Sequence, residues 1–380
     1  MAQHFSSGLT YDDVSLEPDR VDFTRGDIDL STNLSKNVRL EIPIISAPMD
    51  TVTGSTMAVE LGKLGGIGFI HRNQSIETQA QEVATAASEG VQVGAAIGTY
   101  PTDVERADKL IDAGVTILLV DSAHGHSKFV IEMIETLKKR HPKVDVIGGS
   151  IATGRAAKDL AKAGADGLRV GVGPGAICTT RIISGMGVPQ ISALQNVAEF
   201  ANPSNIPFIA DGGINRSGDL AKAIGAGAST VMLGRLLAGT TESIGDIVEL
   251  PADKVPQRFK SILKPNVKMY KFNTYRGMGS LGAMKAGKKL GAGGEFHDKD
   301  YKTDKLVAEG VEGLIPVSGS LQDLVMSMLE GLKSGMYYTG NRTIPELQSN
   351  AHFYINTHAS ILESHPHDML VTNDGGNYNL

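Results

Sequence analysis

The stretch RAAKDLAKAGADGLRVG, which runs from Arg155 to Gly171, decides the fold. Its first part, Arg155–Ala163, has the apolar spacing of an amphipathic helix. Lys162-Ala-Gly164-Ala then ends this helix with a glycine just after the last turn. The mostly apolar run Gly167–Gly171 follows, with the length of a buried strand. Helix, glycine stop and buried strand together form one unit of a parallel α/β protein.

The same unit recurs along the chain. Asp112-Ala-Gly114-Val and Ile224-Gly-Ala-Gly227-Ala repeat the glycine stop. Eight such units favour a closed (β/α)8 TIM barrel over an open doubly wound sheet. We predict strands at Pro43–Ser46, Gly66–Ile70, Val91–Ile97, Thr116–Asp121, Val144–Gly149, Gly167–Gly171, Pro207–Asp211 and Thr230–Gly234, and further helices at Val104–Ala113, Lys128–Lys139 and Gly218–Ile224.

Two segments depart from this rhythm. Lys285–Asp304 reads KAGKKLGAGGEFHDKDYKTD and is rich in glycine and charge, so we expect a mobile flap over about residues 285–313. Apolar runs resume at Leu314–Val317 and Leu321–Met328, and a polar, histidine-containing tail covers about residues 345–380. We therefore expect residues 1–380 to form a single catalytic barrel domain with a flap and a C-terminal extension.

Composition excludes several classes of partner. The 380-residue chain has a net charge of −6 and no block of basic residues, so we expect it to bind no nucleic acid. It has neither a signal-peptide pattern at its start nor an apolar run long enough to span a membrane, so no membrane partner is expected. The single cysteine suits a reducing compartment and predicts a cytoplasmic protein.

That cysteine lies in a loop dense in glycine, Gly171-Val-Gly-Pro-Gly175-Ala-Ile-Cys178, which follows the sixth predicted strand. Catalytic groups of a (β/α)8 barrel come from the carboxyl ends of its strands. A lone cysteine is more often a buried structural residue, but this position favours a nucleophilic thiolate. The loop is a poor dinucleotide-binding fingerprint, because Pro174 interrupts it and it lies late in the repeat.

The next two strands are followed by loops typical of phosphate binding. Asp211-Gly-Gly213 follows the seventh strand and Gly234-Arg235 follows the eighth, where backbone N–H groups often hold a phosphate. Asp211 would then accept hydrogen bonds from ribose hydroxyls. A tight turn with a solvated arginine explains Arg235 about as well. Tyr275-Arg-Gly-Met-Gly-Ser adds a glycine-flexed backbone suited to approach a base.

These motifs together resemble the IMP dehydrogenase and GMP reductase family, and the resemblance extends from Leu9 to about Asp368. Many dehydrogenases of this family carry two CBS domains after the second strand. Here Ile76–Glu89 leads directly to the third strand, so no CBS insertion is expected. The family order is followed by Leu9-Thr-Tyr-Asp-Asp13-Val, Ala47-Pro-Met49-Asp50-Thr-Val-Thr, Asp121-Ser-Ala-His-Gly-His-Ser127, the Cys178 loop, Asp211-Gly-Gly and Tyr275-Arg-Gly-Met-Gly-Ser.

The resemblance implies that Cys178 attacks C2 of a purine nucleoside monophosphate. A dehydrogenase would convert IMP, NAD and water to XMP and NADH, whereas a reductase would convert GMP and NADPH to IMP and ammonia. With the loops above, it implies that Thr180 and Glu309 assist Cys178. It further implies substrate contacts by Met49, Asp211, Gly213, Gly234, Arg235, Tyr275, Met278, Gly279 and Glu309, and cofactor contacts by Asp121, Ser122, Ser150 and Arg169.

The resemblance also implies a potassium ion and a homotetramer. The ion would be held by backbone carbonyls of the Cys178 loop and by the tail of a neighbouring subunit. This feature favours the dehydrogenase branch of the family. The residues concerned are Gly173, Gly175 and Cys178 in one subunit and Glu363, Ser364 and His365 in the other.

The chain departs from the family at four places, one of which is Ser150, where many relatives have asparagine. Dehydrogenases activate water with an Arg-Tyr pair on the flap, but no arginine lies between Arg276 and Arg342. Ala176 and Arg235 replace two serines that meet phosphate. An IMP dehydrogenase-like enzyme that relies on Thr180 and Glu309 is the leading interpretation. A GMP reductase, which uses such a pair, is the second. A weakly catalytic nucleotide-binding paralogue is the third, and a pure binder would need neither Cys178 nor Asp121.

Overall fold

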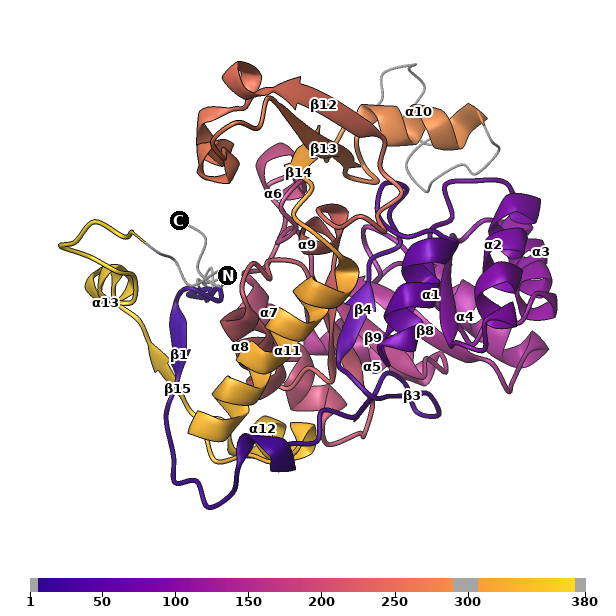
Figure 1. The fold of residues 1–380 in the computed structure, drawn as a ribbon. Coiled ribbons are helices and arrows are strands. Elements are labelled where there is room, and N and C mark those ends of the chain that lie inside the picture. Colours follow the sequence, from indigo (N-terminus) through magenta and orange to yellow (C-terminus); the bar gives the residue numbers. More distant parts are fainter. Residues whose placement is uncertain (1–5, 290–306, 373–380) are drawn as a thin grey trace.

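The computed structural model describes residues 6–289 and 307–372. Its centre is a closed barrel of eight parallel strands, which confirms the predicted TIM barrel (Figure 1). Each predicted strand is present, with ends that differ by no more than two residues. In barrel order the strands are β10 (Phe208–Asp211), β11 (Thr230–Leu233), β4 (Ile44–Ser46), β5 (Ile67–Ile70), β6 (Val93–Ile97), β7 (Ile117–Asp121), β8 (Asp145–Ile151) and β9 (Gly167–Val170).

Helices cover the outside of the barrel and follow the strands in the expected alternation. The three glycine stops have backbone φ values of +94° at Gly114, +101° at Gly164 and +104° at Gly227, which glycine adopts without steric cost. The main helices are α1 (Ser55–Lys63), α2 (Ile76–Ser88), α3 (Pro101–Asp112), α4 (Lys128–Arg140), α5 (Gly154–Lys162), α7 (Gln190–Ala201), α8 (Ser217–Gly225) and α11 (Leu321–Tyr338). The short ones are α6 (Thr180–Ile183), α9 (Arg235–Ala238) and α12 (Ile344–Asn350).

Alternation along the strands divides the core into two layers. Ile45, Phe69 and Leu119 belong to the cluster that fills the barrel interior. Their neighbours Ile44 and Ile70 belong to the larger cluster packed between the strands and the helices. Because successive side chains of a strand point to opposite faces, a strand buried on both faces reads as a continuous apolar run. This is why the barrel strands could be located from sequence.

A small hairpin closes the end of the barrel at which the strands begin. It consists of β2 (Thr32–Asn33) and β3 (Arg39–Leu40), and the apolar side chains of its loop and second strand join the interior cluster. The hairpin is fastened to Asp145 at the start of β8. The Ser35 hydroxyl donates to Asp145 Oδ2 at 2.5 Å, and the backbone and side-chain N–H groups of Asn37 donate to the same carboxylate at 3.0 and 2.8 Å.

An antiparallel three-stranded sheet, absent from the sequence-based prediction, lies over the other end of the barrel (Figure 1). It consists of β12 (Ile247–Pro251), β13 (Met269–Arg276) and β14 (Glu312–Pro316). The helix α10 (Leu281–Lys289) follows β13, so the segment expected to be irregular from Lys285 starts as helix. Burial of Ala283 and Met284 anchors that helix. The rest of the expected flap, residues 290–306, lies outside the described residues.

Two described segments, one early and one late in the sequence, pair with each other beside the barrel. β1 (Val14–Leu16) pairs antiparallel with β15 (Phe353–Ile355), and α13 (His358–Glu363) follows. In Figure 1 this extension stands away from the barrel. The chain runs from β5 through α2 into β6 without an intervening domain. Within residues 6–289 and 307–372, no helix combines the length and the apolar character needed to cross a membrane.

We predict that Asp145→Ala lowers the free energy of unfolding by about 2–4 kcal/mol, because the buried Ser35 hydroxyl and the Asn37 amide lose their charged acceptor. Chemical denaturation of the purified protein measures this loss. The exposed Glu105, replaced by alanine, serves as the control and should leave the midpoint unchanged. Equal midpoints for both variants would contradict the proposed role of the hairpin anchor.

Candidate active site

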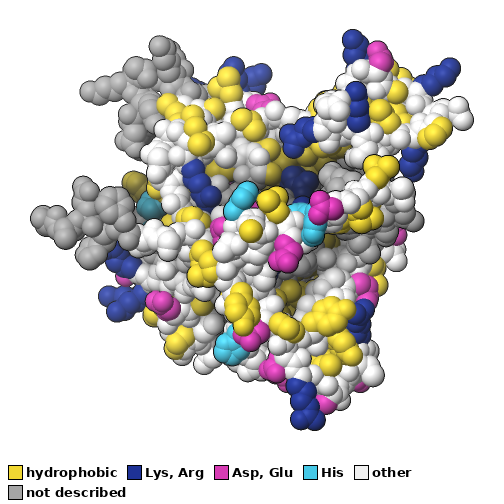
Figure 2. Space-filling view, turned by 90° about the vertical axis from the view of Figure 1, so that its left-hand side faces the viewer, with side chains coloured by type: hydrophobic (Ala, Val, Ile, Leu, Met, Phe, Trp, Pro, Cys, Tyr) yellow, Lys and Arg dark blue, Asp and Glu magenta, His cyan; other side chains and the backbone are white. Residues whose placement is uncertain are grey.

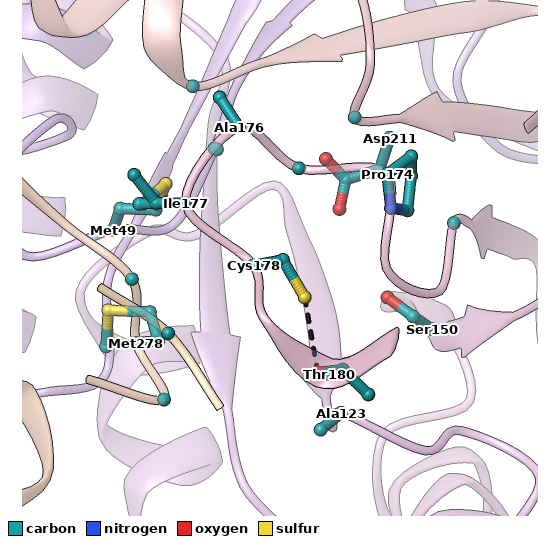
Figure 3. A pocket seen from close by; sticks show the side chains of 18 of the residues that line it. Met49, Ala123, Ser150, Pro174, Ala176, Ile177, Cys178, Thr180, Asp211 and Met278 are labelled. Carbon is teal, nitrogen blue, oxygen red and sulfur yellow. Dashed lines mark hydrogen bonds between the residues drawn. The ribbon is translucent and has the colours of Figure 1, made fainter. Parts of the chain in front are cut away.

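A cavity of about 420 Å³ opens at the carboxyl ends of the barrel strands. In the view of Figure 3, Met49 and Met278 lie on one side of Cys178, and Asp211 and Ser150 lie on the other. The cavity brings together nearly all residues that the sequence assigned to a site. Those that line it are Met49, Asp121, Ser122, Ser150, Arg169, Gly173, Gly175, Cys178, Thr180, Asp211, Gly213, Gly234, Arg235, Tyr275, Met278, Gly279 and Glu309.

The loop after β9 carries Cys178 into this cavity, and two of its glycines are required by close contacts. A Cβ on Gly173, where φ is +88°, would lie 2.6 Å from Cγ of Arg181. A Cβ on Gly171 would collide with the backbone carbonyl of Asp211. The loop then tightens at the nucleophile itself, because the Cys178 N–H donates to the carbonyl of Gly175 at 3.0 Å. Cys178 is a free, half-buried thiol.

The thiol is the first member of a hydrogen-bonded line of three side chains. Cys178 Sγ donates to Thr180 Oγ1 at 3.2 Å (Figure 3). Thr180 Oγ1 in turn donates to Glu309 Oε2 at 2.9 Å. Glu309 is held there by its backbone, since its carbonyl accepts the N–H of Thr179 at 2.9 Å. The line can pass a proton from sulfur or from water to a carboxylate. Its members are separated by 129 positions in sequence at the widest step.

Arg169 forms the charged floor of the cavity. This buried guanidinium donates to Asp121 Oδ1 at 2.6 Å and to the Ser150 hydroxyl at 3.0 Å, and Asp211 Oδ2 lies 3.7 Å away. Burial raises the pKa of Asp121, but the guanidinium groups of Arg169 and Arg72 outweigh it and hold the pKa below its usual value. Burial raises the pKa of Asp211 above its usual value, and Arg169 offsets only part of that rise.

The carboxylates of Asp121 and Asp211 therefore lie in different electrostatic environments. Asp121 is fixed as an anion between two arginines, at the part of the cavity assigned to a cofactor. Asp211 has a weaker ion pair and keeps a quarter of its side chain exposed, so its oxygens can accept hydrogen bonds from a ligand. This matches the chemistry expected of a carboxylate that receives ribose hydroxyls.

A cationic and glycine-rich corner lies next to Asp211. Gly212 and Gly213 have φ values of +94° and +82°, and the half-buried Arg235 donates to Asn215 Oδ1 from Nε at 3.3 Å and from a terminal nitrogen at 3.1 Å. The Tyr275 hydroxyl closes the corner near Gly234. Burial raises the pKa of Tyr275 well above its usual value, so it remains a neutral hydrogen-bond donor. Hydrogen-bond donors and the positive charge of Arg235 suit an anionic group such as phosphate.

Sequence reasoning missed three residues that shape the cavity. Arg72 and Asn73 line it and come directly after β5, the position at which barrel enzymes place functional groups. Asn215, the acceptor for Arg235, follows the glycines of the β10 loop. Arg72, Asn73 and Asn215 each follow the end of a barrel strand, and this position was the sequence signal that could have identified them. Asn73 also donates to Asp50 at 2.6 Å, and Asp50 binds Arg276 at the end of β13 at 2.6 Å.

The tail residues assigned to a cation site are not part of this cavity within one chain. Glu363 and Ser364 are exposed at the end of α13, and His365 follows them. In the described parts of the chain, no group of three or more histidine, cysteine, aspartate or glutamate side chains is placed to hold a metal ion. The carbonyls of Gly173, Gly175 and Cys178 belong to residues that line the cavity.

Comparison with known proteins gives a consistent result. The model of the IMP dehydrogenase / GMP reductase domain matches residues 8–367. Inosine-5'-monophosphate dehydrogenase of Borreliella burgdorferi is 41% identical, with 95% of this chain and 97% of that protein covered. The enzyme of Cryptosporidium parvum is 38% identical, with 99% of each chain covered.

The enzyme of Escherichia coli K12 is 34% identical, with 98% of each chain covered. That alignment extends over 499 positions against a chain of 380, so a long stretch of the E. coli enzyme has no counterpart here. The resemblance inferred from the motifs is thus confirmed over almost the whole length. This chain belongs to the IMP dehydrogenase / GMP reductase family.

Proposed function

We propose that this protein oxidises IMP to XMP with NAD and water through a covalent intermediate on Cys178. The observation that carries the proposal is the line from Cys178 through Thr180 to Glu309, which lies in the same cavity as the cationic corner at Arg235. A nucleotide with its phosphate at that corner and its ribose at Asp211 would present its base to the thiol. The relatives described above are named as inosine-5'-monophosphate dehydrogenases, which agrees with this assignment.

The first step joins Cys178 Sγ to C2 of the purine while the hydrogen at C2 leaves as hydride. NAD, when bound, supplies the acceptor for that hydride. The thiol proton passes to Thr180, whose own proton passes to Glu309. A thiol is a far stronger acid than water, so its deprotonation depends less on a base than the activation of water does. Glu309 therefore assists this step without being indispensable to it.

The second step is hydrolysis of the resulting thioimidate. Once sulfur is bonded to C2, Thr180 no longer receives the thiol proton, and its oxygen can accept a proton from water instead. Water is far less acidic than a thiol, so this step requires a base. Glu309, after it has released the proton of the first step to solvent, accepts the proton of water through Thr180. The C–S bond breaks as C–O forms, which returns the thiol and releases XMP.

One feature of the described residues in the cavity suits an NAD molecule. Asp121, Ser122 and Ser150 line the same cavity as Cys178, and Arg72 and Arg169 are the positive partners of Asp121. An anionic carboxylate held between arginines can accept hydrogen bonds from ribose hydroxyls of the cofactor. We assign these residues to NAD, or to NADP if the enzyme acts as a reductase.

We also propose a potassium ion at the carbonyls of Gly173, Gly175 and Cys178, since backbone carbonyls are the donors that replace water around this ion. One carbonyl, that of Gly175, already accepts the Cys178 N–H, which leaves it one lone pair. The ion would gain further ligands from Glu363, Ser364 and His365 of a neighbouring subunit.

Such sharing requires an oligomer, and we propose a homotetramer. The extension that carries those three residues exposes large hydrophobic side chains to an unusual degree, and Figure 2 looks onto the side of the molecule from which it projects. A cytoplasmic location would keep the lone cysteine reduced, as the mechanism requires. The exposed side chains of the extension are Tyr354, Ile355, Leu362, Met369 and Leu370.

A GMP reductase is the second candidate, and the absence of an arginine between Arg276 and Arg342 is the observation in its favour. A reductase releases ammonia and does not hydrolyse the thioimidate, so the pair Thr180 and Glu309 would then transfer a proton to the leaving nitrogen. Assays with IMP plus NAD and with GMP plus NADPH decide between the two directions. Formation of NADH with IMP is the expected result.

Cys178→Ala should abolish turnover, while the dissociation constant for the nucleotide should change by no more than about threefold, because the thiol makes the covalent bond and little of the binding energy. Steady-state assays and calorimetry measure the two quantities. Turnover within about tenfold of the wild-type rate would overturn the covalent mechanism.

Arg235→Ala should weaken binding of IMP by about tenfold or more and leave binding of inosine nearly unchanged, because only the monophosphate loses a charge-assisted contact. Titration calorimetry with both ligands gives the comparison. Arg216, exposed in the same loop region, provides a matched alanine variant that should bind both ligands normally. Equal weakening of both ligands by Arg235→Ala would place the phosphate elsewhere.

Glu309→Gln should slow hydrolysis by about 10²–10⁴-fold and hydride transfer much less, since only water needs the base. Rapid-mixing single-turnover experiments separate NADH formation from XMP release. The covalent adduct should then accumulate on Cys178 and be visible by mass spectrometry. Lys299 with Tyr301 is the alternative base in the flap sequence and lies outside the described residues. Lys299→Ala should have little effect. A large Lys299 effect with a silent Glu309 would refute this assignment.

A further inference from the structure

Gln190 connects the ends of two barrel strands. It is the first residue of α7, only 2% of it is exposed, and its side-chain amide donates to the carbonyl of Val170 at 2.9 Å and to that of Asp211 at 3.1 Å. These carbonyls belong to the last residues of β9 and β10. Direct pairing of the strands ends at Val170 and Ala210. The amide thus joins the strands just beyond the point where their own ladder stops.

The two strand ends lead into the two loops on which the proposed reaction depends. From Val170 the chain enters the loop that carries Cys178, and from Asp211 it enters the glycines beside the cationic corner. The loops are in direct contact, because a Cβ on Gly171 would collide with the Asp211 carbonyl and would lie 3.2 Å from the Gln190 amide nitrogen. If either loop moves at this point, the Gln190 amide and the other loop must move with it.

Tyr11 supports this junction from the N-terminal segment. Its ring lies against Gly213, where a Cβ would be 3.3 Å away, and its backbone carbonyl accepts from Lys222 at 2.9 Å. Burial raises the pKa of its hydroxyl, the charges of Asp219 and Asp211 add to the rise, and the neighbouring Gln190 side chain opposes it. Tyr11 is therefore in contact with the glycine loop and close to Gln190 at once.

We propose that Gln190 is a positioning residue that fixes the Cys178 loop relative to the loop that holds the ribose and phosphate of the nucleotide. The proposal rests on the function given above, because it assumes that one loop carries the nucleophile and the other the substrate. A nucleophile misplaced by about 1 Å loses about 100-fold in rate, so a link of this kind has a direct kinetic effect.

The chain offers a matched control in Gln79. This glutamine lies in the first turns of α2, is fully buried, and donates from its amide to the carbonyls of Ile70 at 3.3 Å and Ala96 at 2.8 Å. It therefore joins β5 and β6 just as Gln190 joins β9 and β10. Its oxygen accepts from the buried Arg106 at 2.7 Å. Neither of its two strands leads into the Cys178 loop or the phosphate corner.

The test compares Gln190→Met with Gln79→Met in the full chain. Methionine keeps the length of the side chain and removes both hydrogen bonds. Gln190→Met should lower kcat about tenfold and raise KM for the nucleotide about fivefold, with faster amide hydrogen exchange in peptides covering residues 171–178 and 211–215. Gln79→Met should lower the melting temperature, leave KM for the nucleotide within about threefold, and leave exchange in those two peptides unchanged.

Three results would overturn the proposal: kinetics of Gln190→Met equal to those of Gln79→Met, exchange that rises in only one of the two loops, or exchange that rises in neither. If Gln190→Met does not fold, Gln190→Asn replaces it, because the side chain keeps an amide but is one methylene too short to meet both carbonyls. It should produce the same changes in the same direction. Hydrogen exchange needs no substrate, so it tests the link even if the assay with IMP and NAD fails.

Discussion

The burial of one positive charge governs the arrangement of this site. Arg169 leaves β9 toward the cavity, and a buried guanidinium is tolerated only where anions and hydrogen-bond acceptors surround it. Asp121 from β7, Ser150 from β8 and Asp211 from β10 fill that role. Space is made at Gly149, where a Cβ would lie 2.6 Å from that of Arg169. Four neighbouring strands are thus held in one register at the end where the chemistry is placed.

This constraint explains why the two acids of the cavity differ. Asp121 lies between Arg169 and Arg72 and is committed to the anion, whereas Asp211 is farther from Arg169 and burial dominates its pKa. The cavity thereby gains, beside the same guanidinium, one strongly held negative charge and one carboxylate that is more available as a hydrogen-bond acceptor. Arg235 supplies positive charge beyond Asp211. A molecule with a hydroxylated sugar between a base and an anionic group matches this sequence of charges.

Segments outside the barrel complete the cavity from above. The sheet of β12, β13 and β14 is tied to the barrel by the ion pair of Arg276 with Asp50, at 2.6 Å. Backbone pairing of Cys178 with Gly310 then brings Glu309 beside Thr180. The carboxylate that replaces a flap arginine in the proposed mechanism is consequently positioned by the sheet as well as by the barrel. Glu309 can act as a base only because the sheet, anchored through Asp50 and Arg276, holds it beside Thr180.

Much of this protein follows from its sequence alone. Strands buried on both faces give continuous apolar runs, and a helix that ends in a left-handed turn requires glycine. Local sequence patterns therefore locate the barrel strands β4 to β11 and the stops at Gly114, Gly164 and Gly227. Catalytic residues of a barrel lie at the carboxyl ends of its strands, so locating the strands also located most of the residues that line the cavity.

Only the tertiary structure decided the remaining features. These features are the sheet above the barrel, the ion pair between Asp50 and Arg276, and the link through Gln190. Each joins parts of the chain that local periodicity cannot relate. Asp50 and Arg276, for example, are separated by 226 positions. The pair of Thr180 and Glu309 was expected from the family resemblance, but no local pattern relates residues 129 positions apart, and their hydrogen bond is a product of the folded chain. Hydrogen bonds and ion pairs act over a few ångströms in space, and the folded chain determines which distant residues come within that range.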